Sequence, residues 1–163
     1  QLLGPLGVEN RTSISKSKMA EWQEEGFIEY LGETDNVVSY IRKACCVVLP
    51  SYREGTSRVL LEAAAMGRPL IATDVPGCRE IVDEGITGFL CRPRDYTSLS
   101  QKIELMLELP HKTRIVMGRK GREKIERQFN QDIVCDLYVE VIKMAMSPTL
   151  SQKVNPTKIS NEK

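Results

Sequence analysis

Short apolar runs alternate with stretches of helical period along most of the chain, and this alternation is the feature that most restricts the fold. Apolar runs separated by helical patterns are typical of βαβ units, which build a parallel sheet flanked by helices. The predicted strands are LLG near the start, FIEYLG at 27–32, CCVVLP at 45–50, RPLIAT at 68–73 and TGFLC at 87–91. The predicted crossover helices are the amphipathic stretches at 16–26, 34–44 and 57–67. The pattern therefore predicts the α/β class with a parallel sheet.

The strand signals stop at Tyr96, and three helical patterns follow that end near Met144. Pro110 and the Gly118–Gly121 stretch are weak breaks between them. We predict that the fold ends in helices. Residues 146–163 are polar, contain two prolines and lack a period, so we predict a mobile tail there.

Length and composition restrict the function classes. A chain of 163 residues suits one domain, which we place at 1–145. The formal charge of +1 offers no electrostatic reason to expect nucleic acid as a partner. Five cysteines without a C-x-x-C pair are interpreted as reduced thiols rather than a zinc site. Any membrane contact is expected to be peripheral, and the start at Gln1 suggests a fragment of a longer protein.

The segment EGTSRVLLE, residues 54–62, combines a loop, a helix start and two carboxylates. It follows the buried strand predicted at 45–50, and ligands of open α/β sheets sit at the carboxyl ends of the strands. Gly55 leaves the backbone accessible, and the amides of Thr56, Ser57 and Arg58 at the helix start suit a phosphate. Thr56 or Ser57 is expected to cap the helix.

Glu54 and Glu62 stand on either side of that phosphate position. Carboxylates accept hydrogen bonds from hydroxyls and repel anions, so the ligand should carry hydroxyls at both ends and phosphate between them. A nucleoside diphosphate sugar has this layout. The alternative from spacing alone is that Glu54 complements the helix dipole and Glu62 is a solvated surface residue.

Further residues near the same edge are candidates for the wall of the cleft. Asp74 and Gly77 lie in the TDVPGCRE loop after the strand predicted at 68–73, and Asp74 is equally well explained as a turn former. Arg53 and Arg58 flank the phosphate position, where the alternative is a solvated surface charge.

Several ordered motifs resemble one enzyme family. PSYREGTSRVLLEAAAMGRPLIATDVPG resembles the donor-binding core of the family 4 retaining glycosyltransferases, with E-x7-E, a small-residue helix, G-[KR]-P and an A-T-D-x-x-G loop. The resemblance covers residues 1–145. It implies a Rossmann-like sheet belonging to part of the C-terminal domain of a GT-B glycosyltransferase, whose first strand and helix and whose acceptor domain are expected to lie outside this chain.

The resemblance also implies roles for the two acids. Glu54 would contact the donor sugar and stabilise positive charge on it, and Glu62 would bind the ribose hydroxyls. Where the family often has Gly-Phe-Gly-Leu, this chain has Gly55-Thr56-Ser57-Arg58, in which Ser57 is expected to donate its amide. This variant and the VPGCRE segment resemble a branch that makes surface polysaccharides and lipid-linked oligosaccharides, often from UDP-N-acetylhexosamines.

The expected function is therefore that of the donor domain of a retaining, metal-independent glycosyltransferase that needs no cofactor. Its partners would be a nucleotide sugar and a glycan or lipid-linked acceptor held by the rest of the protein, and the chain alone should be inactive. The expected location is the cytoplasm, with association at the inner membrane face left open. The alternatives are a nucleotide-sugar epimerase or phosphorylase of the same architecture, and a catalytically silent nucleotide-binding or scaffold module.

Overall fold

The structure is a computed structural model that describes residues 1–7 and 13–146. It contains two compact units, one formed by Gln1–Ala44 and one that begins at Cys45. The prediction of a single domain over 1–145 stays a prediction. The mobile tail predicted at 146–163 lies, apart from Met146, outside the described residues.

The first unit contains two short helices, α1 (Lys16–Glu24) and α2 (Val37–Lys43). Ser15 caps α1 by accepting a hydrogen bond from the Lys18 amide at 3.1 Å. The strands predicted at the start of the chain and at 27–32 are wrong as strands, because they meet only in an isolated parallel bridge between Leu2 and Tyr30. Beyond this bridge the Gly4 amide donates to the Gly32 carbonyl oxygen at 2.9 Å, but in the described residues the two segments form no continuous ladder.

The second unit is built on a parallel sheet of three strands in the order β1-β2-β3. These are β1 (Val47–Leu49), β2 (Leu70–Thr73) and β3 (Gly88–Cys91), and their registers pair Val47 with Leu70 and Leu70 with Gly88. Every residue of β2 is buried, as expected for the central strand of a covered parallel sheet. The prediction of an α/β fold with a parallel sheet is confirmed.

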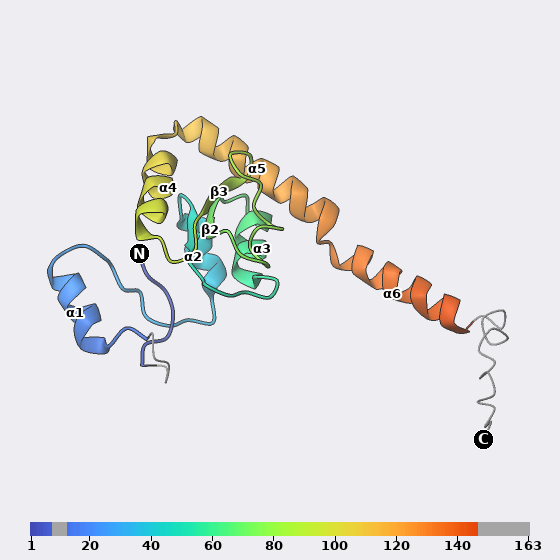
Figure 1. Ribbon diagram of the computed structural model, residues 1–163, viewed down its shortest axis with the longest axis horizontal. Helices are drawn as coiled ribbons and strands as arrows, with labels where there is room; N and C mark the ends of the chain where they lie inside the picture. The colour runs from blue at the N-terminus through green and yellow to red at the C-terminus, as the bar shows by residue number, and fades with distance from the viewer. Residues whose placement is uncertain (8–12, 147–163) are drawn as a thin grey trace, which may run out of the picture. The chain divides into compact units, whose positions relative to one another are not determined.

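Helices flank these strands (Figure 1), and two of them, α3 (Arg58–Ala65) and α4 (Tyr96–Glu108), pack against the sheet. The third, α5 (His111–Gln128), packs on α3. Buried Ile71 of β2 clusters with Met106 of α4 and Met117 of α5. The core of the unit therefore lies where these helices meet the middle strand.

The glycines at 118–121 do not break a helix, contrary to the sequence-based prediction, since both lie inside α5. A Cβ at Gly118 would stand 2.0 Å from the carbonyl oxygen of Gly67, and one at Gly121 would touch Ala64. Gly118 is a glycine because the backbone of α5 passes close to Gly67 at the end of α3, whereas a Cβ at Gly121 would make only ordinary contacts. Packing, rather than chain termination, explains Gly118.

The last described helix, α6 (Gln131–Met146), has no buried residue. The predicted helical ending of the fold is confirmed. In the two described ranges, none of the helices combines the length and the apolar character that crossing a bilayer requires.

Candidate nucleotide-sugar site

The loop from Pro50 to Ser57 joins the carboxyl end of β1 to the start of α3. Ser57 occupies the N-cap position, but its side chain makes no capping hydrogen bond. Glu54 lies half-buried in the loop and Glu62 lies half-buried on α3. The structure thus places one carboxylate before the helix start and the other inside the helix, as the sequence predicts.

Gly77, from the loop that follows β2, contacts the backbone of the loop that follows β1. The Ser57 amide donates to the carbonyl oxygen of Gly77 at 3.3 Å. Gly77 has φ +85°, and a Cβ added to it would stand 1.4 Å from the Gly55 carbonyl oxygen and 2.9 Å from that of Glu54. Only glycine allows the two backbones to approach so closely.

This contact corrects one expectation. The sequence suggested that the Ser57 amide is available to a ligand, but Gly77 already accepts its hydrogen bond. The role of Ser57 in donor binding stays a prediction. The other amides of the first turn of α3, which begins at Arg58, have no intrahelical acceptor and keep the helix start suited to an anion.

The Gly77 loop is itself held by side chains from its own segment. The Gly77 amide donates to Glu80 Oε2 at 2.6 Å, and Arg79 donates to Asp74 twice, from Nε to Oδ1 at 2.9 Å and from Nη2 to the carbonyl oxygen at 3.0 Å. Asp74 therefore acts within its own turn. Its place in the wall of a cleft, like that of Gly77, stays a prediction.

The arginines near the helix start are exposed. The side chain of Arg58 is 91% exposed, with Nη2 3.8 Å from Glu62 Oε1, while the Glu62 side chain is 41% exposed. Such a solvated pair contributes little to stability. Glu62 is accessible to a ligand because its side chain is 41% exposed. Arg53 is also exposed, and its predicted place in the cleft wall stays untested.

Cys78 gives the site an unusual electrostatic neighbour. Burial, together with the carboxylates of Glu54 and Glu80, raises the pKa of the Cys78 thiol to about 11. The thiol is therefore neutral at physiological pH. Cys78 therefore places no second negative charge near the Glu54 carboxylate.

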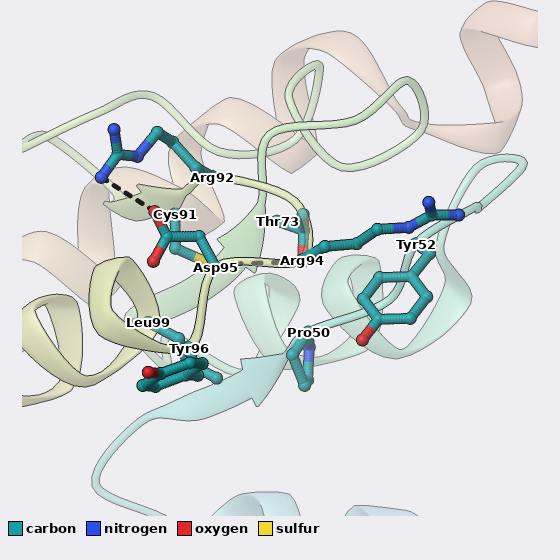
Figure 2. A pocket seen from close by; sticks show the side chains of 9 residues that line it. All are labelled: Pro50, Tyr52, Thr73, Cys91, Arg92, Arg94, Asp95, Tyr96 and Leu99. Carbon is teal, nitrogen blue, oxygen red and sulfur yellow. Dashed lines mark hydrogen bonds and ion pairs between the residues drawn. The ribbon is translucent and has the colours of Figure 1, made fainter. Parts of the chain in front are cut away.

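A pocket of about 300 Å³ opens at the carboxyl ends of the three strands. Figure 2 shows its lining, which is Pro50, Tyr52, Thr73, Cys91, Arg92, Arg94, Asp95, Tyr96 and Leu99. The residues that line this pocket after β3 were not predicted from the sequence. The RPRD segment, which places two arginines directly after the strand predicted at 87–91, could have indicated them.

In the described part of the chain, the structure contains no group of three or more His, Cys, Asp or Glu side chains able to hold a metal ion. The expectation that the protein needs neither a metal nor a cofactor stays a prediction.

Residues 6–109 match the family described as glycosyl transferases group 1, and the chain belongs to this family. One curated relative is the N,N'-diacetylbacillosaminyl-diphospho-undecaprenol alpha-1,3-N-acetylgalactosaminyltransferase of Campylobacter jejuni. It is 29% identical over 121 residues, which are 74% of this chain and 32% of the relative. The chain spans about a third of the length of the curated relatives it matches.

Solved structures of similar fold include sucrose-phosphate synthase from Thermosynechococcus elongatus, with a TM-score of 0.74 and 25% identity, over 88% of this chain and 37% of that one. HepE from Anabaena in complex with UDP has a TM-score of 0.69 and 22% identity, over 78% of this chain and 35% of that one. These likenesses confirm the predicted fold, which is that of part of a domain of GT-B glycosyltransferases.

Proposed function

We propose that the full-length protein transfers an N-acetylhexosamine from a UDP-linked donor to a lipid-linked or polysaccharide acceptor, with retention at the anomeric carbon. The observation that carries this proposal is the placement of Glu54 and Glu62 on either side of the α3 start, at the carboxyl end of β1. Membership in the group 1 glycosyl transferases supports the reaction class.

The donor and the acceptor are proposed from the similar proteins. HepE is solved with UDP, and the Campylobacter relative is named for N-acetylgalactosamine transfer and for a diphospho-undecaprenol compound. Glu62, whose side chain is 41% exposed, would accept hydrogen bonds from the ribose hydroxyls. The first-turn amides of α3 would bind the pyrophosphate, since a helix start favours anions.

Glu54 would act at the sugar. Positive charge develops on the anomeric centre as the bond to the diphosphate breaks, and a fixed carboxylate nearby stabilises the transition state more than the ground state. Gly77 would position Glu54 by holding the backbone of residues 54 and 55. Arg53, Asp74 and Gly77 would form the wall beside the sugar.

The test combines binding and product analysis on the full-length protein. Calorimetry should detect UDP binding, and NMR should show an α-linked product from a UDP-α-N-acetylhexosamine and a synthetic lipid diphosphate acceptor. Absence of UDP binding would contradict the donor site. Release of an epimerised sugar or a sugar phosphate would instead favour the epimerase or phosphorylase alternative. UDP binding without any turnover would favour the catalytically silent module.

The curated relatives are more than twice as long as this chain, and we propose that acceptor recognition lies in the additional part. The 163-residue chain assayed alone should therefore show no transfer, because the acceptor would not be held against the donor. Turnover by this chain would contradict that division of roles. A cytoplasmic location remains part of the same proposal.

A further inference from the structure

Arg94 adopts a backbone conformation that its residue type disfavours. Its φ of +59° is the only positive φ of a non-glycine residue in the ranges 1–7 and 13–146. It follows Pro93 in the turn between β3 and α4, where the second residue of a Pro-containing turn with positive φ is normally glycine. An arginine at this position carries strain that glycine would avoid, and such strain often accompanies a functional role.

The Arg94 side chain lies at the pocket of about 300 Å³ described above. Its guanidinium carbon lies 5.5 Å from the centre of the Tyr52 ring, and Figure 2 shows the side chain extended toward that ring. Tyr52 is 57% exposed. A cation–π contact at an exposed ring is weak, so it does not by itself account for a strained backbone.

The charge of Arg94 is not neutralised by a neighbour. In the parts of the chain that the structure describes, Arg94 forms no ion pair with a carboxylate. Asp95 is engaged elsewhere, because its Oδ2 pairs with Arg92 Nη2 at 2.8 Å and its Oδ1 accepts from the Ser98 amide at 2.8 Å. The pocket therefore carries one uncompensated guanidinium.

The residues that line the pocket suit a sugar that carries an anionic group. A guanidinium forms two parallel hydrogen bonds with a phosphate or a carboxylate. Tyr52 and Tyr96 supply flat aromatic faces beside it, and the volume is near the lower limit of small-molecule sites, enough for one ring.

We propose that Arg94 and Tyr52 form a subsite for an anionic sugar, separate from the nucleotide site at the start of α3. The phosphate or carboxylate of this sugar would bind the Arg94 guanidinium, with the ring placed against Tyr52. The choice of a sugar rests on the proposed function, whereas the preference for an anion rests on Arg94 itself.

The experiment titrates the full-length protein with glucose 6-phosphate, glucuronate and neutral glucose, followed by the amide NMR signals of Tyr52, Arg94 and Tyr96. At least one of the two anions should shift these signals and bind at least tenfold more tightly than glucose. The anionic sugar that binds more tightly identifies either phosphate or carboxylate as the recognised group. Equal binding of all three sugars, or of none, would overturn the proposal.

Two variants test the role of Arg94. Arg94→Gly should lower the affinity for the anionic sugar at least tenfold and raise the melting temperature by about 2 °C, because glycine relieves the positive φ. Arg119→Gln removes an equal charge from an exposed arginine on α5 and should leave the sugar affinity unchanged. A lower melting temperature for Arg94→Gly with unchanged sugar affinity would show a structural role and overturn the proposal.

Measurements of UDP affinity distinguish a failure of the subsite proposal from a failure of the proposed function. Arg94→Gly should bind UDP as the unchanged protein does. A loss of UDP affinity in this variant would show that Arg94 belongs to the nucleotide site, which would contradict a separate subsite while leaving the proposed function intact. Failure of the unchanged protein to bind UDP would contradict the proposed function and not the anion subsite.

Discussion

The two loops that leave the carboxyl ends of β1 and β3 are held in different ways. The loop after β1, which carries Glu54, depends on Gly77, a residue from another part of the chain. The loop after β3 is held by its neighbours in sequence, since Asp95 caps α4 and the Arg92 amide donates to Ser98 Oγ at 3.0 Å. The first loop should therefore be sensitive to distant substitutions, and the second only to local ones.

The largest expected effect is that of Gly77→Ala. The new Cβ would stand 1.4 Å from the Gly55 carbonyl oxygen, and φ is +85°, so the two loops must separate. We expect a loss on the order of 3 kcal/mol in the free energy of unfolding, measured by urea denaturation. Transferase activity should be lost with it, because Glu54 moves with the Gly55 backbone.

Gly55→Ala is the matched control for this substitution. A Cβ at Gly55 meets nothing within 4 Å, so the same change of residue type should cost well under 1 kcal/mol in the same denaturation experiment. Equal stability losses in the two variants would show that the close approach at Gly77 does not hold the loop.

The second prediction separates the roles of the two carboxylates in the full-length protein. Glu54→Gln should lower kcat about 100-fold with little change in UDP affinity, because the carboxylate acts on charge that appears in the transition state. Glu62→Gln should weaken UDP binding by about 1 kcal/mol, a modest value because the Glu62 side chain is 41% exposed.

Steady-state rates and calorimetry on both Glu variants provide the measurements. If neither variant changes kcat or UDP affinity, the two acids are structural and the donor site is assigned to the wrong residues. If both variants unfold, the acids belong to a network that supports the fold.

The third prediction concerns the self-contained loop after β3. Asp95→Ala removes the side-chain cap of α4 and the partner of Arg92, which should cost about 1 kcal/mol of stability. UDP affinity should not change, because the loop after β1 does not depend on this contact. A loss of UDP binding in this variant would show that the two loops are coupled.

The smallest effect is a pH dependence that comes from Cys78. Its folded-state pKa of about 11 lies above the ordinary thiol value of 9.0 because of burial and the nearby carboxylates of Glu54 and Glu80. The neutral thiol therefore contributes stability that is fully present below pH 9 and is lost as the pH rises toward 11. Melting temperatures of the unchanged protein and of Cys78→Ala should converge between pH 8 and pH 11, and a constant difference would contradict the raised pKa.

Local patterns were sufficient to predict most elements of the second unit. The three strands of the sheet and the helices α3 and α4 appear where the apolar runs and helical periods placed them, and three helices follow Tyr96 as predicted, although α5 continues through the predicted break at 118–121. The strand predicted at 27–32 failed, because an apolar run becomes a strand only when a long enough partner lies beside it. The prediction of a break at the glycines of α5 was wrong, because Gly118 is required by its close approach to the backbone of Gly67, which is distant in sequence.

The sequence by itself determined the class of fold, the family, and the order of the acids around one helix start, since these depend on residue type and on spacing along the chain. Only the tertiary structure decided that the Gly77 carbonyl oxygen accepts a hydrogen bond from the Ser57 amide, and that the Arg94 guanidinium contacts the Tyr52 ring. Each of these contacts joins residues from separate loops. Parallel strands bring such loops to one edge of the sheet, and the distance between them is a property of packing that spacing along the chain does not encode.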